Sequence, residues 1–401
     1  MYKGDNGMAR VMVIAGGTWQ CPIVRLAKSK GHYVICSNLY EDSPAFQYAD
    51  IGVVANVLDK KKNLEIAREY RPDVVLTEQT DIAVSTVAYL AEELGIKGIG
   101  SEIAARFTNK YLMRKFTDEA GFASPRYALC HTKEEAGEFL HKTGRSIMKP
   151  LDSQSSRGVH IVDSAEQVNM YFEDCIQYSN SEEAVIMEEY IDGIEFTVDG
   201  LKTEDTYYVT AISEKEHYEY NASVAKRLFF SQSNERFDYE ELGRINTAMV
   251  SAMGLPFGIT HAEYKYKDGK FYLIEIAARG GGTRISSDIA PLMSGINSNE
   301  IYLEILLGKK VKVIPGKKHE CAVLGFFDFK PGKVVKIEGL EKALKLPGVV
   351  DIGIEVAVGD DLGQAKDDRS RCGYYLIYGE SQKELEDREQ KVKNTVKVIT
   401  E

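Results

Sequence analysis

The chain has 401 residues, and this length favours two or three domains over a single hydrophobic core. The formal net charge of −11 argues against a nucleic-acid partner. No run approaches the roughly 18 apolar residues that a membrane span needs, and the first residues are too polar for a signal peptide. Six cysteines without CxxC spacing indicate reduced thiols. We therefore expect a cytoplasmic protein without a membrane partner.

The first hundred residues alternate strand and helix signals. Strand-like apolar runs at 11–17, 32–38 and 73–79 are separated by helix-like stretches, a pattern that predicts a Rossmann-like parallel sheet with helices on both faces. Gly16 and Gly17 do not form the GxGxxG fingerprint, and Asn38 occupies the position at which NAD-binding proteins carry an Asp or Glu. An NAD-dependent oxidoreductase is therefore disfavoured.

The pattern changes after residue 100. Residues 102–121 predict one long helix that ends at Gly121, and an α+β region of strands and helices continues to about residue 310. Beyond Pro315 the apolar runs predict a small β-rich unit closed by a charged helix at 381–399. We expect domains at 1–100, 101–312 and 313–401, with a lid lobe at about 125–190 in the second.

The stretch HAEYKYKDGKFYLIEIAARGGGTR, residues 261–284, predicts a β-hairpin with two carboxylates. A two-residue Asp268-Gly269 turn would put Glu263 and Glu275 on opposite faces. A three-residue loop that includes Lys267 puts them on one face instead, and we expect this loop. Two carboxylates on one face could hold Mg²⁺, although a solvated strand face remains an equally good interpretation.

Two further stretches carry weaker signals. In RSIMKPLDSQSSRGVHIV, Lys149 ends a strand and a loop from Asp152 to Gly158 leads into the next strand; such a loop could fold over phosphates, but a plain hairpin loop is the commoner interpretation. In VIMEEYIDGIEFTVDGL, Glu188 and Glu195 lie at strand ends, where acidic residues are mostly just solvated.

Together and in this order, the three stretches resemble the ATP-grasp superfamily of carboxylate–amine ligases, most closely its L-amino-acid ligase branch. The resemblance covers nearly the whole chain. It implies a Rossmann-like N-terminal domain, a two-lobed ATP-grasp domain and a small β-rich C-terminal domain, with ATP and Mg²⁺ (or Mn²⁺) as cofactors. It also implies small carboxylate and amine (or thiol) substrates, an acylphosphate intermediate and ADP release, and it is compatible with a homodimer.

The resemblance implies a set of site residues. Lys110 and Lys149 would reach the nucleotide phosphates. Glu263 and Glu275 would bind the metal, Arg279 would steady the transferred phosphoryl group with His261 nearby, and Arg284 would grip a substrate carboxylate. The remaining nucleotide contacts would come from the lid loop (Ser153, Ser155, Ser156 and Gly158), from adenine-lining residues (Glu188, Glu189 and Ile191) and from Glu195 at the ribose.

Three departures from the family pattern stand out. Ala277 replaces the asparagine that commonly completes the metal site, the lid has one glycine where relatives have several, and His261 stands where several relatives have a basic residue. Alternatives therefore stay open: a purine-pathway or biotin carboxylase-like enzyme, or an ATP-binding regulator without turnover. Residues 31–50 look like the second-strand region of purine-pathway relatives. Glu78, Tyr218, Tyr220, Lys226 and Arg227 are candidates for the substrate pocket.

Overall fold

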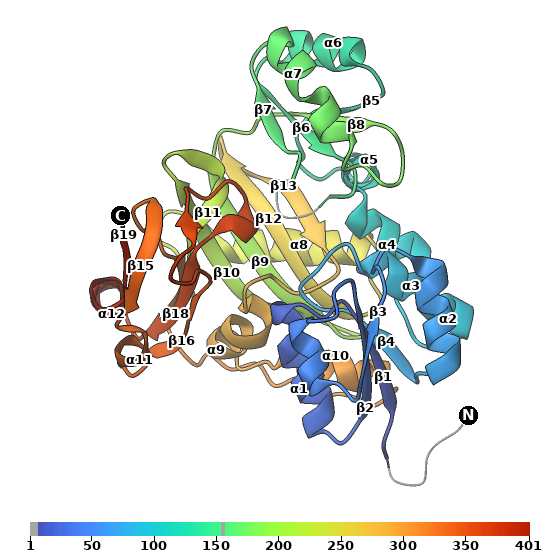
Figure 1. The fold of residues 1–401 in the computed structure, drawn as a ribbon. Helices are drawn as coiled ribbons and strands as arrows, with labels where there is room; N and C mark the ends of the chain where they lie inside the picture. The colour runs from blue at the N-terminus through green and yellow to red at the C-terminus, as the bar shows by residue number, and fades with distance from the viewer. Residues whose placement is uncertain (1–6, 154–156) are drawn as a thin grey trace.

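The computed structural model describes residues 7–153 and 157–401. Its N-terminal unit is a parallel four-stranded sheet in the order β3-β2-β1-β4, and the predicted Rossmann-like alternation is confirmed. Helices cover both faces of this sheet (Figure 1). The bounds of its elements are β1 (Arg10–Ile14), η1 (Thr18–Gln20), α1 (Cys21–Ser29), β2 (Tyr33–Asn38), η2 (Pro44–Tyr48), β3 (Ile51–Val54), α2 (Lys60–Tyr70), β4 (Val74–Leu76) and α3 (Val84–Leu94).

The long helix predicted at 102–121 is wrong, because the structure has two helices there, α4 (Ser101–Thr108) and α5 (Lys110–Glu119). Asn109 lies between them with an extended backbone, and its side chain accepts a hydrogen bond from the Leu112 N–H. A capping asparagine competes with helix continuation. The break places Lys110 at the first position of α5, where its N–H donates to the carbonyl oxygen of Leu151 at 2.7 Å.

The lid lobe is a separate four-stranded sheet in the order β5-β8-β6-β7, with two helices packed on it at the top of Figure 1. It contains β5 (Tyr127–Cys130), α6 (Lys133–Thr143), β6 (Ser146–Pro150), β7 (His160–Val162), α7 (Ala165–Ile176) and β8 (Val185–Glu189). The loop between β6 and β7 is the predicted lid loop.

A large eight-stranded sheet, in the order β13-β12-β9-β10-β11-β14-β18-β16, forms the centre of the molecule. Helix α8 packs against one face, where Phe196, Val198 and Tyr264 contact Leu242 and Met249 in a hydrophobic core. The elements of this region are β9 (Ile194–Lys202), β10 (Tyr207–Tyr218), β11 (Asn221–Ser231), α8 (Tyr239–Ala252), β12 (Gly258–Lys267), β13 (Lys270–Ala277), η3 (Ile285–Ile289), α9 (Ala290–Ser294) and α10 (Ser298–Leu306).

The C-terminal strands continue the large sheet, because β14 pairs with β11. A three-stranded sheet, β17-β15-β19, and α12 complete this unit. Its elements are β14 (Cys321–Phe326), β15 (Gly332–Glu338), α11 (Leu340–Ala343), β16 (Val349–Ile354), β17 (Asp361–Leu362), η4 (Asp368–Ser370), β18 (Gly373–Gly379), α12 (Gln382–Thr395) and β19 (Lys397–Thr400). The domain boundaries at 100/101 and 312/313 stay predictions. No helix in the described part of the chain is long and apolar enough to cross a membrane.

The hairpin turn predicted from the sequence is wrong, although the two carboxylates do share a face. Lys267 pairs with Lys270 across a two-residue turn, in which Asp268 and Gly269 both have positive φ angles. The register then shifts by one residue between Glu263 and Tyr264. A β-bulge inserts one extra residue into one strand, so Leu273 faces the α8 core while Glu275 pairs directly with Glu263.

Candidate functional site

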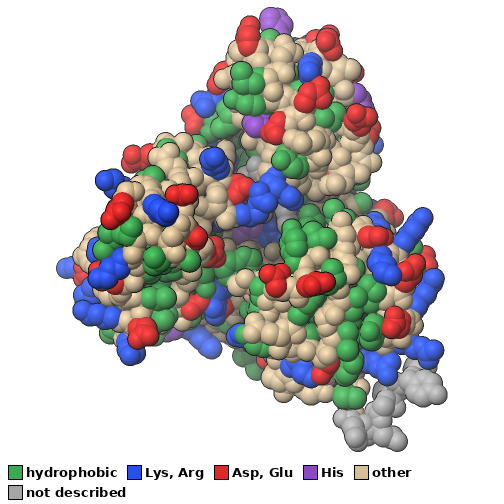
Figure 2. All heavy atoms as spheres, in the orientation of Figure 1, with side chains coloured by type: hydrophobic (Ala, Val, Ile, Leu, Met, Phe, Trp, Pro, Cys, Tyr) green, Lys and Arg blue, Asp and Glu red, His purple; other side chains and the backbone are tan. Residues whose placement is uncertain are grey.

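The face of the large sheet opposite α8 carries rows of polar side chains. The strand register aligns Glu275, Glu263, Thr197 and Ser213 in one row, and Ala277, His261, Asp199 and Ala211 in the next. Directly opposed side chains in a sheet lie within contact distance of one another. This face borders the hollow between the three lobes, whose wall shows Lys and Arg side chains (Figure 2). The register thus gathers residues that are up to 78 positions apart in the chain (Thr197 to Glu275, and Asp199 to Ala277).

Lys215 of β10 joins two of the predicted site residues. Its Nζ lies 2.6 Å from Glu195 Oε1 and 2.7 Å from Glu263 Oε1. Burial would raise the pKa of each carboxyl, but the Lys215 ammonium outweighs it, so the pKa of Glu195 falls to about 2 and that of Glu263 lies well below its ordinary value. Both carboxylates are therefore ionised at neutral pH and held in fixed positions.

The two predicted phosphate-binding lysines each contact a carboxylate. Lys110 Nζ lies 2.9 Å from Glu275 Oε1 and also donates to the Ser153 carbonyl oxygen at 2.9 Å. Lys149 Nζ lies 2.7 Å from Glu188 Oε2. These contacts fix both ammonium groups, one against the large sheet and one in the lid sheet.

Arg114 connects the lid sheet to the hairpin. Its Nε lies 2.7 Å from Glu188 Oε1, without the alignment of a hydrogen bond, and its guanidinium donates to the Ile274 carbonyl oxygen. Burial raises the pKa of Glu188, but Arg114 and Lys149 outweigh it and lower the pKa to about 2. The Glu188 carboxylate thus contacts both cations, and its position beside the adenine stays a prediction. Arg114 follows Lys110 by four residues, so the two share one face of α5.

His261 and Asp199 form a buried pair on the polar face. His261 Nδ1 lies 2.9 Å from Asp199 Oδ1, and its Nε2 lies 3.8 Å from Glu263 Oε1. Burial would lower the pKa of His261, but the Asp199 carboxylate outweighs it and raises the pKa to about 9. The imidazolium is therefore the form that this environment favours at neutral pH, and it can balance negative charge on a bound group.

The glycine-rich turn that follows β13 is anchored to the end of β4. Arg279 forms a two-point ion pair with Asp81, at 3.0 Å from Nε and 2.7 Å from Nη2. The N–H of Gly280 donates to Glu78 Oε1 at 3.0 Å. A Cβ on Gly280 would come within 2.1 Å of Glu78 Oε1, and one on Gly281 within 2.7 Å of Asp199 Oδ1. These two glycines are therefore required by contacts within the protein.

Arg284 already contacts two carboxylates. Its Nε and Nη2 donate to Asp288 at 2.9 and 2.8 Å, and its Nη1 donates to Asp351. Two of the five guanidinium N–H groups are left for another ligand, and the role predicted for Arg284 at the substrate carboxylate stays a prediction.

The other predicted nucleotide contacts lie in the lid lobe or beside it. The Ser153 hydroxyl is buried without a hydrogen-bond partner in the described part of the chain. Gly158 has a positive φ, and a Cβ at this position would come within 2.6 Å of the Tyr178 ring. Glu189 pairs with Arg126 at 2.8 Å, and Ile191 is buried. Ser155 and Ser156 lie outside the described residues.

The donor set suits a hard divalent ion. Glu263 and Glu275 oppose each other on adjacent strands, and carboxylate oxygens are ligands that Mg²⁺ or Mn²⁺ prefers. Among residues 7–153 and 157–401, no group of three or more acidic, histidine or cysteine side chains is arranged to hold a metal ion. Two protein carboxylates, with phosphate oxygens and water supplying the other ligands, is the usual way that Mg²⁺ is bound beside a nucleotide.

Sequence reasoning missed Lys215, Asp199 and Arg114. Lys215 and Asp199 show only as single charges within long strands, and only the strand register reveals their partners.

Of the pocket candidates, Tyr218 and Tyr220 stack on each other. Arg227 instead pairs with Glu216 and Glu389, and Lys226 lies 3.6 Å from Asp328. Arg227 therefore belongs to a separate charge cluster that joins β10 and β11 to α12.

Comparison with known proteins agrees with this geometry. Residues 145–288 match the family model described as ATP-grasp domain, and residues 325–401 match the model described as L-amino acid ligase C-terminal domain 2. The chain therefore contains an ATP-grasp domain followed by an L-amino acid ligase C-terminal domain, and the resemblance seen in the sequence is confirmed.

Three similar proteins illustrate the match. Formate-dependent phosphoribosylglycinamide formyltransferase of Synechococcus sp. (strain WH7803) is 25% identical over 391 residues, covering 92% of this chain and 98% of that protein. The L-amino acid ligase structure from Bacillus licheniformis has a TM-score of 0.80 at 21% identity, covering 98% of this chain and 99% of that chain. The third is the structure of the biotin carboxylase domain of Hydrogenobacter thermophilus 2-oxoglutarate carboxylase, solved with MgADP and bicarbonate. It has a TM-score of 0.74 at 14% identity, covering 98% of this chain and 90% of that chain.

These comparisons confirm the predicted fold class and the predicted class of enzyme. The protein is an ATP-dependent ligase of the ATP-grasp type, a class that forms C–N bonds with release of ADP.

Proposed function

We propose that this protein joins the carboxyl group of an amino acid, or of a similar small carboxylate, to an amine through an acylphosphate intermediate. The observation that carries the proposal is the facing pair of Glu263 and Glu275, each bound to a lysine, beside the turn that carries Arg279. Two fixed carboxylates flanked by cations can bind a nucleoside triphosphate together with its divalent metal ion. The protein would work in the cytoplasm on small molecules.

The proposed reaction has two steps. A carboxylate oxygen of the substrate attacks the γ-phosphorus of ATP, the bond to the bridging oxygen breaks, and ADP leaves. The amine nitrogen then attacks the acyl carbon, loses a proton and displaces phosphate. Glu263 and Glu275 would hold Mg²⁺ (or Mn²⁺), which when bound shields the charge of the triphosphate.

The protein's own cations would carry the rest of the chemistry. Lys110 and Lys149 would bind phosphate oxygens, because their ammonium groups are already fixed on the two sides of the proposed nucleotide site. Arg279 and His261 would offset the negative charge that develops on the transferred group. No protein nucleophile is required for this route.

A purine-pathway reaction is the second candidate, since the similar formyltransferase acts, by its name, on a phosphoribosyl compound. A ribosyl phosphate would need free backbone N–H groups, and the glycine-rich turn before α1 is the usual place for an anion in such a sheet. In this turn the Gly17 N–H already donates to Gln20 Oε1 at 3.0 Å, and Gln20 Nε2 donates to the Glu78 carbonyl oxygen at 2.6 Å. This arrangement supports a substrate that carries no phosphate.

A screen for ADP release tests the proposal. The purified protein is incubated with ATP, Mg²⁺ and single or paired amino acids, and products are identified by mass spectrometry as condensates that lack one water. We expect ADP release that depends on an amino acid and is absent in Glu275→Gln. ADP release only with formate and a phosphoribosyl amine would favour the second candidate. Nucleotide binding without any carboxylate-dependent ADP release would favour a regulator.

A further inference from the structure

Five residues from three parts of the chain form a closed ring of contacts at the end of the glycine-rich turn. We call it the Arg284 ring. The Arg284 N–H donates to Gln79 Oε1 at 3.1 Å, and Gln79 Nε2 donates to the Trp19 carbonyl oxygen at 3.0 Å. The Trp19 ring meets the Tyr374 ring edge-on, with centroids 5.5 Å apart. The Tyr374 hydroxyl donates to Asp351 Oδ2 at 2.6 Å, and Asp351 accepts from Arg284 Nη1.

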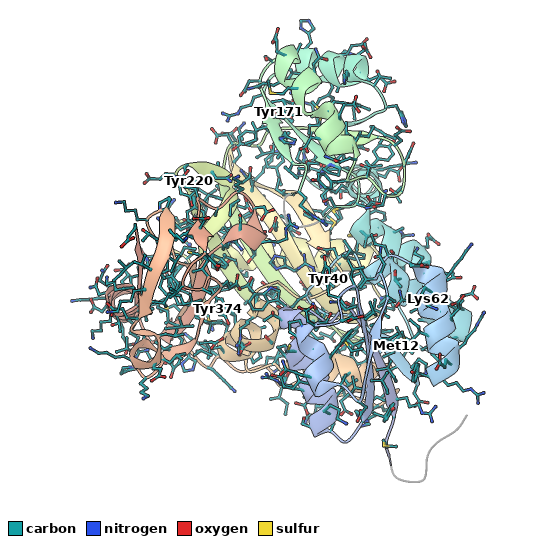
Figure 3. The ribbon with its side chains drawn as sticks, viewed as in Figure 1. Met12, Tyr40, Lys62, Tyr171, Tyr220 and Tyr374 are labelled. Carbon is teal, nitrogen blue, oxygen red and sulfur yellow. The ribbon has the colours of Figure 1, made fainter. Side chains whose placement is uncertain are left out.

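The ring joins all three structural units. Trp19 lies in η1 and Gln79 in the loop after β4, both in the N-terminal unit. Arg284 ends the glycine-rich turn, and Asp351 and Tyr374 lie in β16 and β18. Figure 3 labels Tyr374 among the C-terminal strands. The contact between units is the charged hydrogen bond from Arg284 to Asp351, which the Tyr374 hydroxyl holds in place within the C-terminal unit. Such a bond is directional, so it fixes orientation as well as proximity.

The backbone at the ring supports a positioning role. Gln79, Thr283 and Arg284 have φ angles of 56°, 48° and 68°, in the left-handed region that non-glycine residues avoid. Each such residue is strained and persists where the surroundings impose its conformation. Arg284, the strained residue at the end of the turn, is held in the ring through both its backbone N–H and its guanidinium, so the ring contributes to the shape of the turn.

The turn matters because the groups proposed to act on the substrate adjoin it. Arg279 begins the turn and pairs with Asp81, and Gly281 lies against the Asp199 and His261 pair. A shift at the Arg284 end of the turn would therefore move these groups relative to the γ-phosphoryl group.

We propose that Arg284, Asp351 and Tyr374 are positioning residues, which hold the glycine-rich turn and Arg279 in the geometry that phosphoryl transfer needs. The proposal rests on the ligase function proposed above. It assigns a task to the C-terminal unit, namely to complete the catalytic turn through Asp351 and Tyr374. It also replaces the role predicted for Arg284 as a direct ligand of the substrate carboxylate.

Asp351→Asn and Tyr374→Phe test this proposal. Asparagine keeps the shape of the Asp351 side chain and weakens its contacts with Arg284 and Tyr374, and phenylalanine removes the hydroxyl that donates to Asp351. Misplacement by about 1 Å can cost a hundredfold in rate, so we expect kcat to fall by about tenfold to a hundredfold. The KM values for ATP and for the carboxylic substrate should stay unchanged, because no proposed ligand of either is altered. Glu384→Gln, which breaks the Arg388–Glu384 pair of α12 in the same unit, is the matched control and should keep full kcat.

If Arg284 instead binds the substrate, Asp351→Asn would free its guanidinium and lower the KM for the carboxylic substrate; that result would overturn the proposal. A second measurement is independent of any substrate. Hydrogen exchange of the amides at 280–286 should speed up by about tenfold in both variants, and not in Glu384→Gln, because the ring limits local opening. Unchanged exchange would overturn the ring even where the ligase function holds. If hydrogen exchange confirms the ring but the protein releases no ADP with any carboxylate, then the proposed ligase function is wrong and the ring is not.

Discussion

At the scale of single residues, the site is built from opposite charges that contact one another. Lys215 binds both Glu195 and Glu263, and Lys110 binds Glu275. Removing one partner of a buried pair leaves the other charge uncompensated, which is costly. Substitutions at these positions therefore need a measurement of folding beside the measurement of activity.

Glu275→Gln should abolish ligase activity while the protein stays folded. The amide keeps the shape of the side chain but removes the charge that would bind the metal ion. The rate should fall on the order of a thousandfold or more, since several kcal/mol of charge stabilisation are lost. Steady-state ADP release, with circular dichroism as the folding check, measures this. Glu235→Gln, at an exposed position, is the control, and a Glu275→Gln rate within tenfold of the native rate would contradict the metal assignment.

Lys149→Met should weaken ATP binding and slow phosphoryl transfer, because methionine keeps the length of the side chain and removes its charge. Lys149 is buried beside Glu188, whereas Lys142 of α6 is exposed. Calorimetric titration with a non-hydrolysable ATP analogue should therefore show weaker binding for Lys149→Met and native binding for Lys142→Met. Equal affinities for the two variants would show that Lys149 does not contact the phosphates.

At the scale of elements, the β12–β13 hairpin depends on two local features that act in opposite directions. The Asp268-Gly269 turn alone would place Glu263 and Glu275 on opposite faces, and the bulge beside Glu263 restores them to one face. The Leu273 N–H donates to the Ala123 carbonyl oxygen, and Arg114 contacts the Ile274 carbonyl oxygen. The segment at 114–123, which precedes the lid lobe, thus contacts the backbone of β13 at the bulge.

Gly269→Ala should lower stability, and Gly137→Ala should raise it. Gly269 has a φ of +79°, where an alanine costs about 1–2 kcal/mol. Gly137 lies inside α6 with open space around its would-be Cβ, so an alanine there should add about 0.5–1 kcal/mol. Urea unfolding of the two variants measures both changes. Equal shifts in the same direction would mean that the turn does not need the left-handed conformation.

At the scale of the whole molecule, the three units meet at the glycine-rich turn, and Glu78 is a buried member of that junction. Its carboxylate accepts hydrogen bonds from the Gly280 N–H and from the Ser286 hydroxyl. Burial raises the pKa of Glu78 from its ordinary value of 4.5 to about 7, although the Ser286 hydroxyl acts to lower it. The contact between the N-terminal sheet and the turn is therefore sensitive to pH.

Stability should fall as the pH rises from about 4.5 to about 7. In this range the unfolded chain has released the Glu78 proton while the folded protein still holds it, so the folded state binds more protons and is favoured at lower pH. The slope from this group reaches about 1.4 kcal/mol per pH unit. Glu78→Gln cannot titrate, so its free energy of unfolding, measured against pH, should lack this slope. Glu69→Gln at an exposed position of α2 should retain it, and a slope that persists in Glu78→Gln would assign it to another group.

The sequence by itself determined the features that depend on local patterns. The alternation of apolar runs and helical stretches predicted the N-terminal parallel sheet, and the order of the three short motifs predicted the ATP-grasp class. Glu263, Glu275 and His261 were named from the hairpin pattern, and the structure places them on one face of the sheet. Lys110 was named from the family resemblance, and it contacts Glu275 from α5. Periodicity and turn chemistry act over a few residues, so they can be seen in the chain directly.

Only the tertiary structure decided the features that depend on distant partners. The bulge in β13, the helix break at Asn109 and the lysine that joins Glu195 to Glu263 have no local signature strong enough to predict them. The same holds for the contacts of Arg284 with Asp288 and Asp351. The physical reason is that the state of a charged side chain is set by burial and by neighbouring charges, and strand register brings these neighbours from positions far apart in the chain.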